Sequence, residues 1–516
     1  MDSPMALLRF IAPQIPGLSY AAVQHTLGLT NTSKQWDLRT ELTVKVLRDM
    51  MNYGAGRKTV PPISKVQAGT LRDSGVKGKM WIAPAFLPEP PSADEAGGQG
   101  MRDVVFRAID EMAPNKDAIN YTKPELEDIK VEWTGYRPNA GKNDSLPSDN
   151  AGENFKSLMR EACRTSETTI LYFHGGAYYL CDPVTHRALT SRLAKESHGR
   201  VCSVRYRLAP QTAFPGQLLD ALQCYLSLLY PPENSFHEAV PADKIVFAGD
   251  SAGGNLAFAL LQLLLQLHRS SPAPTIRFHG RDVLVPLPAG CSANSGWFDI
   301  ARSLPSIVSN SKYDYLPPPK QGDAISSFPN EPGVWPADPP RGDLFCDLSL
   351  LDHPLVSPVL AQDWSGSGPL WFCTGQEMLT DEDCIVAKTA ARQDVIVQFE
   401  QYESMPHCFA MLLPHLDTSE RLMKSWGEWA RKAVEEKESL KTNGVFVPVR
   451  QGGEIQVNVK EIEAPSYEEV LRCVRESKEK RLLGFEKEGK MMPKPAFVIY
   501  MVYNIVLPCA LSWRQV

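Results

Sequence analysis

The feature that most constrains this chain is an alternation of short apolar runs with amphipathic stretches between about residues 79 and 436. The runs are rich in β-branched and aromatic residues, and they cover 80–86, 129–136, 168–173, 201–206, 244–248, 283–286, 370–374 and 395–402. The middle runs are continuously apolar, as strands buried on both faces must be. Other stretches space their apolar residues by three or four, as helices do, and they cover 188–197, 218–230, 254–269, 383–392 and 419–436. This alternation predicts an α/β domain with a mostly parallel sheet.

Composition excludes several classes of function. The 516 residues would make about two to four average domains. The 54 basic and 60 acidic residues give a net charge of −6, so nucleic acid is not expected as a partner, because neutralising phosphates requires clustered lysine and arginine. The eleven cysteines show no metal-ligand spacing, and we expect them to be free thiols in a reducing compartment.

The strongest chemical motif is G-D-S-A-G at residues 249–253, between an apolar run and a helical stretch. This is the G-x-S-x-G nucleophile elbow in its strand–turn–helix context. The turn is so sharp that side chains at the two glycine positions would collide with neighbouring backbone. It presents Ser251 at the start of a helix, where free N–H groups and partial positive charge favour an oxygen that becomes anionic. We expect a structural role for Asp250, and the alternative for the whole motif is a helix start made of small residues.

A second motif, H-G-G-A at residues 174–177, directly follows an apolar run. A loop with two glycines can bring backbone N–H groups close to a substrate carbonyl. We therefore expect the N–H groups of Gly175, Gly176 and Ala252 to form an oxyanion hole. His174 is expected to orient this loop rather than to act as a base, because the base histidine comes last in such folds.

A serine is a weak nucleophile unless a base held by an acid activates it. In the α/β-hydrolase order both partners follow the serine. His407 stands in the loop M-P-H-C-F, directly after the last expected strand, and is the predicted base. His415 is the fallback.

Together these residues resemble the hormone-sensitive-lipase-like branch of the α/β-hydrolases, which includes arylacetamide deacetylases and many microbial and fungal esterases. The resemblance covers about residues 165–435, and it rests on the H-G-G loop, Y-R-L-A-P with a following F-P and Asp220, the G-D-S-A-G-G elbow and the M-P-H-C-F end. It implies an α/β-hydrolase fold. We predict a mostly parallel, eight-stranded sheet flanked by helices, with a helical or irregular cap.

The resemblance also points to the acid, with one departure. Family members usually have D-P-L-x-D-E, whose first Asp is catalytic, where this chain has E-M-L-T-D-E at residues 377–382. The matching residue is Glu377, 30 positions before His407. Glutamate can still accept a hydrogen bond from the imidazole. Asp381 is the runner-up, and the alternative for either acid is stabilisation of a helix N-terminus.

The rest of the chain is predicted to form a cap and a tail. We expect an N-terminal cap segment at 1–78, a catalytic domain at 79–436 with a cap insertion at about 300–345, and a C-terminal extension at 437–516, after the last sheet element. Eight prolines between residues 310 and 345 are too dense for regular structure. Aromatic residues in and beside the caps would either line an apolar acyl pocket or pack the cap on the sheet; they are Trp36, Trp297, Phe298, Tyr313, Tyr315, Phe328 and Trp335.

The extension contains two further features. A mixed-charge run at 468–490 is expected to be a solvated helix or linker. The uncharged apolar segment 496–513 spans about 18 residues, whereas a membrane helix needs about 20. It fits either a membrane-associated segment or an apolar tail packed on the protein itself. The N-terminus does not have the pattern of a signal peptide, so we expect a cytoplasmic protein, or one associated with the endoplasmic reticulum membrane.

The resemblance implies a serine hydrolase, that is, a carboxylesterase, lipase or deacetylase. It would cleave small-molecule esters of short to medium acyl or acetyl groups through an acyl-enzyme formed by Ser251, His407 and Glu377. This chemistry needs no metal or organic cofactor. Two alternatives stay open: a non-catalytic ligand-binding relative, against which the presence of His407 counts, and a scaffold whose tail docks on a membrane or a partner.

Overall fold

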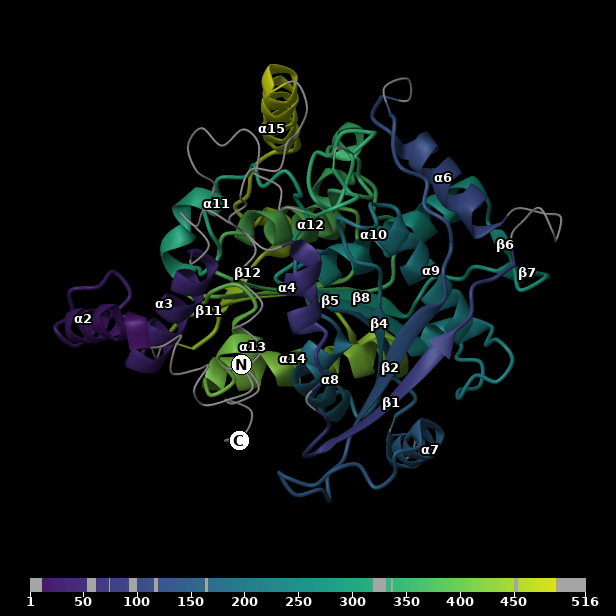
Figure 1. Cartoon of the computed structure of the whole chain (residues 1–516), viewed down its shortest axis with the longest axis horizontal. Helices are drawn as coiled ribbons and strands as arrows, with labels where there is room; N and C mark the ends of the chain where they lie inside the picture. Colours follow the sequence, from purple (N-terminus) through teal and green to yellow (C-terminus); the bar gives the residue numbers. More distant parts are fainter. Residues whose placement is uncertain are drawn as a thin grey trace.

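A ten-stranded sheet runs through the computed structural model of the chain (Figure 1). Its strands, in spatial order, are β1 (Met80–Leu87), β2 (Ile129–Tyr136), β4 (Arg200–Arg205), β3 (Thr169–Phe173), β5 (Ile245–Asp250), β8 (Gly290–Asn294), β9 (Leu370–Gly375), β10 (Val397–Tyr402), β11 (Asn443–Val447) and β12 (Ile455–Val457). Neighbours from β4 to β11 are parallel, and β1, β2 and β12 join antiparallel. The structure describes residues 12–52, 62–73, 75–91, 100–115, 119–162, 166–318, 331–335, 337–449 and 453–488.

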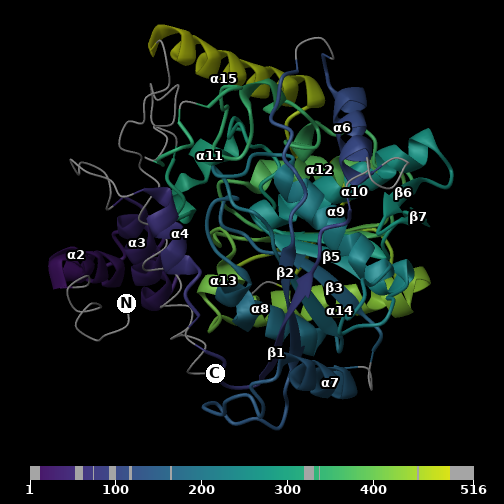
Figure 2. The ribbon, with the colours of Figure 1, turned by 45° about the vertical axis from the view of Figure 1, so that its right-hand side comes forward.

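Helices cover both faces of the sheet (Figures 1 and 2). On one side lie α6 (Met101–Met112), α9 (Gly216–Leu229), α10 (Ala252–Ser270) and α12 (Thr380–Arg392), and on the other α8 (Pro183–Glu196), α13 (Phe409–Leu412) and α14 (Asp417–Glu435), while α7 (Ala151–Ala162) packs on β1 and β2. This explains the continuous apolar runs. In β3, Leu171 and Phe173 enter one buried cluster, whereas Ile170 and Tyr172 enter the other.

The predicted α/β-hydrolase architecture is confirmed, but the predicted number of eight strands is too small. The first half of the run at 283–286 lies in β7 (Arg281–Leu284), which pairs with β6 (Thr275–Phe278) in a separate hairpin. The strand that takes its place in the sheet is β8, whose sequence G-C-S-A-N lacks large residues. Small residues are needed there, because a Cβ on Gly290 would lie 2.8 Å from the carbonyl oxygen of Pro369 and 3.2 Å from the ring of Trp429.

The C-terminal extension supplies two of the additional strands, which corrects the expectation that residues 437–516 follow the last sheet element. Strand β11 pairs in parallel with β10, and β12 closes this edge of the sheet. The mixed-charge run forms α15 (Tyr467–Glu488), as one of its two interpretations predicted. This helix is not solvated all round, since Val470 and Val474 are buried in the main core cluster.

The N-terminal part is helical, as its sequence pattern indicates. It forms α2 (Ile15–Thr26), α3 (Leu38–Asn52) and α4 (Ile63–Thr70), and α2 and α3 pack together at one side of the molecule (Figures 1 and 2). The proline-rich insertion includes α11 (Ser306–Ser309). Short 3-10 turns occupy Ala12–Gln14, Ala242–Lys244, Ser311–Tyr313, Leu348–Leu350, Pro358–Leu360, Lys437–Ser439 and Val459–Glu461.

The apolar segment 496–513 lies outside the described residues, so its two interpretations stay predictions. Within the described ranges, no helix combines the length and the apolar character that crossing a membrane requires. The nine cysteines in these ranges are free thiols.

The role of the C-terminal strands can be tested by placing a charge in β11. Val445 is 3% exposed, and we expect V445D to lower the free energy of unfolding by about 3 kcal/mol or more, because the change removes a buried apolar side chain and buries a carboxylate. Urea denaturation measures this loss. The matched variant N443D changes an exposed residue of the same strand and should unfold at nearly the wild-type midpoint. Equal midpoints for V445D and N443D would contradict the packing of this strand.

Candidate active site

The sharp turn between β5 and α10 carries Ser251. Its backbone has φ 53° and ψ −121°, a strained combination for a residue with a side chain. The Ser251 N–H donates to the carbonyl of Asn294 on β8 at 3.0 Å, and the residue is partly exposed. A hydrogen bond to the neighbouring strand thus supports the strained backbone. Ser251 is partly accessible at the start of a 19-residue helix.

The two glycines of the elbow are required by close packing. A Cβ on Gly249 would lie 2.3 Å from the carbonyl carbon of Gly253. A Cβ on Gly253 would lie 1.9 Å from the carbonyl oxygen of Phe173. A side chain at either glycine would therefore collide with the backbone, as the sequence predicts.

His407 and Glu377 are in direct contact. The Nδ1–H of His407 donates to Oε2 of Glu377, and both side chains are buried, at 3% and 0% exposure. His407 follows β10 and Glu377 follows β9. Because these neighbouring strands are parallel, their carboxyl ends bring the two loops together. The contact leaves Nε2 of His407 as the nitrogen that can accept a proton.

The surroundings of His407 favour its charged form. Burial acts to lower the pKa of His407, but the carboxylate of Glu377, with smaller contributions from Asp314 and Asp250, outweighs burial and raises it. The thiol of Cys408 lies 3.6 Å from Nε2. Burial raises the pKa of this thiol far above its usual range, so it stays protonated and is a poor competing nucleophile.

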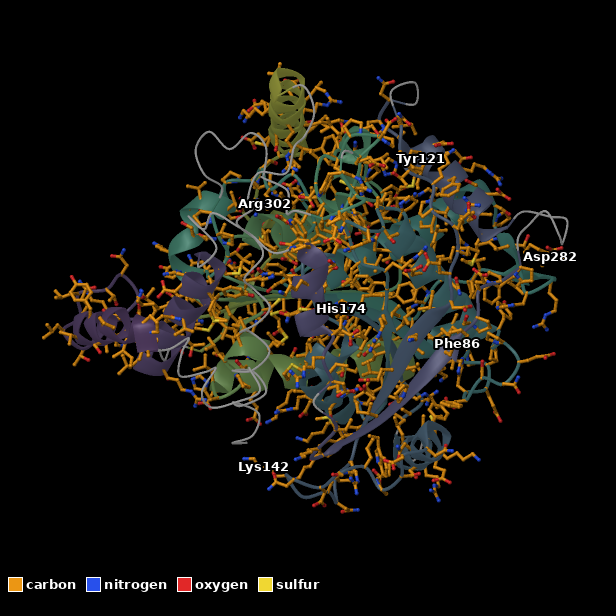
Figure 3. All side chains as sticks on the ribbon, in the orientation of Figure 1. Phe86, Tyr121, Lys142, His174, Asp282 and Arg302 are labelled. Atoms are coloured by element: carbon orange, nitrogen blue, oxygen red, sulfur yellow. The ribbon has the colours of Figure 1, made fainter. Side chains whose placement is uncertain are left out.

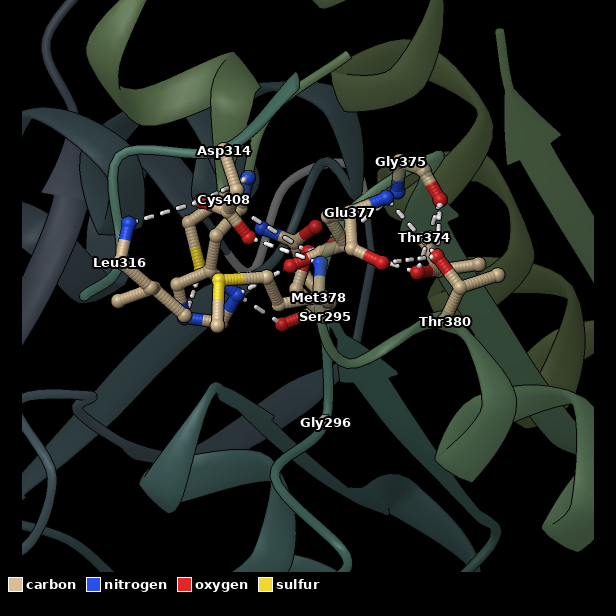
Figure 4. A network of polar contacts seen from close by, with 12 residues as sticks. Ser295, Gly296, Asp314, Leu316, Thr374, Gly375, Glu377, Met378, Thr380 and Cys408 are labelled. Atoms are coloured by element: carbon tan, nitrogen blue, oxygen red, sulfur yellow. Dashed lines mark hydrogen bonds and ion pairs between the residues drawn. The ribbon is translucent and has the colours of Figure 1, made fainter. Parts of the chain in front are cut away.

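The second oxygen of Glu377 is also fully engaged (Figure 4). Its Oε1 accepts from the hydroxyl of Ser295 at 2.5 Å, from the N–H of Gly375 at 3.1 Å and from the hydroxyl of Thr374 at 3.2 Å. The hydroxyl of Ser295 in turn accepts from the N–H of Cys408 at 3.1 Å, next to the histidine. These bonds fix the carboxylate in the orientation that faces the imidazole.

The runner-up residues lie elsewhere. Asp381, in the first turn of α12, accepts from the N–H of Ser306 at 2.8 Å and makes no contact with His407 among the described residues. Asp381 thus lies at the start of α12 and bonds the first N–H of α11, which fits the alternative of a carboxylate that stabilises a helix N-terminus. His415 faces Asp37 at 3.8 Å.

The Ser251 hydroxyl and His407 are not hydrogen-bonded to each other in the part of the chain that the structure describes. Catalytic hydrogen bonds of this kind commonly tighten only when substrate is bound. The elbow and the histidine loop are nevertheless close, since the thiol of Cys408 lies 3.9 Å both from the carbonyl oxygen of Asn294 and from the carboxylate of Asp250.

The loop at 174–177 differs in one respect from the expected oxyanion hole. The N–H of Gly175 donates to Oδ1 of Asp250 at 3.0 Å, so it is not available to a substrate oxygen. Within the described ranges, no protein acceptor takes the N–H groups of Gly176, Ala177 or Ala252. Gly176 and Ala177 are also partly exposed. Two of the three expected donors, Gly176 and Ala252, thus keep an N–H group without an acceptor among the described residues, as does Ala177, whereas Gly175 does not.

His174 and Asp250 have the structural positions that the sequence predicted. Figure 3 shows His174 in the middle of the molecule, and its ring stacks on Tyr206 with centroids 4.3 Å apart. Burial lowers its pKa to about 3, so the ring is neutral at ordinary pH and cannot hold a proton as an imidazolium. Asp250 also accepts from the hydroxyl of Tyr172 at 2.5 Å and lies 3.4 Å from His186.

The cap aromatics that the structure describes are largely buried. Trp36, Trp297, Phe298, Tyr313 and Tyr315 have at most 8% exposure and belong to the two core clusters, which agrees with the packing interpretation. Phe328 lies outside the described residues. The described ranges contain no group of three or more metal-binding side chains.

Ser295 and Asp314 are site residues that sequence reasoning missed. Ser295 follows β8, the strand whose small residues gave no strand signal, so its place beside Glu377 could not be inferred. Asp314 lies in the proline-rich insertion, where no periodicity indicates a structure.

The elbow can be tested with two neighbouring glycines. We expect G253A to lose most activity and to unfold at a clearly lower temperature, because its Cβ would overlap backbone at 1.9 Å. The control G254A places its Cβ 3.1 Å from the Cβ of Ala293, so a shift of a few tenths of an ångström relieves it. Thermal unfolding and ester hydrolysis measure both effects. An active G253A protein with an unchanged melting temperature would contradict the described packing.

The comparisons with known proteins agree with this geometry. Residues 170–316 and 335–411 match a family model described as the alpha/beta hydrolase fold. The chain is 29% identical over 274 residues to an acetyl-hydrolase of Streptomyces hygroscopicus. This match covers 53% of this chain and 78% of the relative. It is 27% identical over 280 residues to an esterase of Acinetobacter venetianus, covering 54% of this chain and 79% of the relative. Versiconal hemiacetal acetate esterase of Emericella nidulans is 29% identical over 248 residues, covering 47% of this chain and 74% of its own length.

Among solved structures, a crystal structure of an esterase from the bacterial hormone-sensitive lipase family overlaps 76% of this chain and 98% of its own, with 20% identity and a TM-score of 0.46. The matched family model and the curated relatives indicate the same fold. The chain has the alpha/beta hydrolase fold, and its ordered motifs resemble those of the hormone-sensitive-lipase-like branch.

Proposed function

We propose that this protein is a serine carboxylic ester hydrolase in which Ser251 is the nucleophile, His407 the general base and Glu377 the acid of the triad. The observation that carries the proposal is the buried contact between His407 Nδ1 and Glu377 Oε2, on loops beside the strained elbow of Ser251. The curated relatives, which are named as esterases and hydrolases, support the same reaction class.

The first step forms an acyl-enzyme. Nε2 of His407 takes the proton of Ser251 as its oxygen attacks the ester carbonyl, and the bonded carboxylate of Glu377 stabilises the resulting imidazolium. The carbonyl electron pair moves to oxygen and gives a tetrahedral oxyanion. The intermediate collapses, the alkoxide takes the proton from His407, and the alcohol leaves.

The oxyanion is held by backbone donors. Among the described residues, the N–H groups of Gly176, Ala177 and Ala252 have no protein acceptor, and Ala252 starts α10, whose N-terminus adds partial positive charge. Each such donor is typically worth about 3 kcal/mol of transition-state stabilisation. In the second step, water deprotonated by His407 attacks the acyl-enzyme, and Ser251 leaves with the proton returned.

We infer that the substrates are small-molecule esters of acetyl or short to medium apolar acyl groups. Two of the relatives are named for acetyl or acetate groups, which supports this size class. Five of the described cap aromatics, Trp36, Trp297, Phe298, Tyr313 and Tyr315, are packed into the core, which favours a small acyl site over an extended one. A non-catalytic ligand-binding or scaffold role is not favoured, because a binding protein has no need of a base aligned by a buried acid.

The nucleophile is tested by S251A. We expect wild-type protein to hydrolyse p-nitrophenyl acetate and butyrate and to be titrated by a serine-directed organophosphate. S251A should lose roughly 10⁴-fold or more in kcat, because only the oxyanion hole and binding remain. Steady-state kinetics and mass spectrometry of the labelled protein measure both effects. Undiminished turnover by S251A would disprove the mechanism.

The acid is identified by comparing two amide variants. We expect E377Q to reduce kcat roughly 10³- to 10⁴-fold, because an amide cannot hold the imidazole in the required tautomer or stabilise its charged form. D381N, on the neighbouring helix, should keep a nearly wild-type kcat and lose some stability through its bond to Ser306. If only D381N lowers kcat, the assignment of Glu377 is wrong.

A further inference from the structure

A second carboxylate lies at the catalytic centre. Asp314 follows the 3-10 turn of the proline-rich insertion, and it is fully buried. Its Oδ1 accepts from the N–H groups of Tyr315 at 2.7 Å and Leu316 at 3.2 Å, which form its own turn. Its remaining contacts reach two other loops.

Those two loops carry the acid and the base. Oδ2 of Asp314 accepts from the N–H of Met378 at 2.9 Å, directly after Glu377. Oδ1 accepts a longer bond, at 3.4 Å, from the N–H of His407 itself. In Figure 4, Glu377 lies between Asp314 on one side and Thr374 and Gly375, at the end of β9, on the other. One side chain therefore joins the insertion to both catalytic loops.

The segment of Asp314 is held from outside by the N-terminal helix α3. The guanidinium of Arg48 donates to the carbonyl oxygens of Asp314 at 2.6 Å, Lys312 at 2.5 Å and Ser311 at 3.3 Å. Ahead of α3, the indole of Trp36 donates to the carbonyl of Ser404 at 2.7 Å, in the loop of His407. The N-terminal part thus contacts two of the three segments that Asp314 joins, the insertion and the loop of His407.

The charge of Asp314 also bears on the base. Several titratable groups face His407: Glu377 from the loop after β9, Asp314 from the insertion, Asp250 from the end of β5, Cys408 from its own loop, and the ring of Tyr315 at 6.1 Å. Burial and the nearby Glu377 raise the pKa of Asp314 above its usual value, and His407 and the N–H donors offset this only in part. A carboxyl group that accepts from several N–H groups is best satisfied when ionised.

We propose that Asp314 is a positioning residue of this hydrolase, which holds the loops of Glu377 and His407 in register and places a second carboxyl group against the backbone of His407. This inference rests on the proposed function. Asp314 touches no reacting atom, and it acts through the N–H groups of Met378 and His407. Its charge favours the imidazolium that forms in each proton transfer.

The test is D314N, assayed with p-nitrophenyl butyrate across pH. The variant keeps the shape of the side chain but removes its charge and turns one acceptor into a donor that opposes a backbone N–H. We expect kcat to fall roughly 10- to 100-fold, because small displacements of catalytic groups have effects of this size, while KM changes little. Asp314 raises the pKa of His407, so its loss should move the acidic limb of kcat/KM to lower pH.

The matched control is D299N. Asp299 is an equally buried aspartate whose side chain accepts from backbone N–H groups, those of Ala301 and Ser303. Among the described residues its side chain contacts neither catalytic loop, and its own N–H donates to Glu382 on α12, a bond that D299N leaves in place. D299N should lower stability without moving the acidic limb. A folded D314N protein with unchanged kcat and an unchanged acidic limb would overturn the inference, and so would equal shifts of the limb in D314N and D299N.

A second variant covers the case in which D314N does not fold. R48M removes the three bonds that hold the Asp314 segment but leaves the buried carboxylate in place. We expect a lower kcat, a nearly constant KM and an unmoved acidic limb. Wild-type kcat in R48M together with a non-folding D314N would count against the inference. Organophosphate titration separates this result from a failure of the proposed function, because a wild-type chain that neither hydrolyses the ester nor is titrated lacks the activity itself.

Discussion

The buried contact between Glu377 and His407 constrains everything around it. Two ionisable groups withdrawn from water are destabilising unless their remaining hydrogen-bonding capacity is satisfied. The second oxygen of Glu377 meets this condition through Ser295, Thr374 and Gly375, which come from two neighbouring strand ends. The strand order therefore determines which hydroxyl reaches Glu377. If β8 were not inserted between β5 and β9, the hydroxyl that supports the acid would not reach it.

The same constraint explains why the acid can be a glutamate. The side chain is longer than aspartate by one methylene, and a longer carboxylate has more orientations to restrict. Here the hydroxyl of Ser295 bridges Oε1 of Glu377 and the N–H of Cys408, so the acid and the histidine loop are fixed to one another rather than separately. The extra length is absorbed by added hydrogen bonds, and the carboxylate still faces Nδ1.

The sequence predicted those parts of the site that obey local rules. The elbow needs glycines at fixed spacing, and His407 and Glu377 stand just after apolar strands, so motif and order were sufficient. Strand β8 was missed because close packing against Trp429 and Pro369 requires small residues, which give no strand signal. Gly175 was given the wrong role because its N–H is taken by Asp250, a contact between segments 75 residues apart. Ser295 and Asp314 act through contacts of the same long-range kind, which no local pattern records.

Helices α3 and α15, which lie outside the hydrolase motifs, also hold the insertion that contains Asp314. On α15, Arg481 donates to the carbonyl of Ala301 at 2.9 Å and Ser477 donates to the same oxygen at 3.1 Å, while Lys478 pairs with Asp352 at 2.5 Å. These bonds reach both sides of the insertion that contains Asp314. On α3, the guanidinium of Arg48 donates to the carbonyl of Asp314 in that insertion. A hydrolase core of parallel strands supplies the residues of the proposed triad, and the insertion that contacts the loops of two of them is itself held by α3 and α15. Sequence changes in these outer helices are thereby coupled to the orientation of the acid and the base, even though neither helix contains a catalytic group.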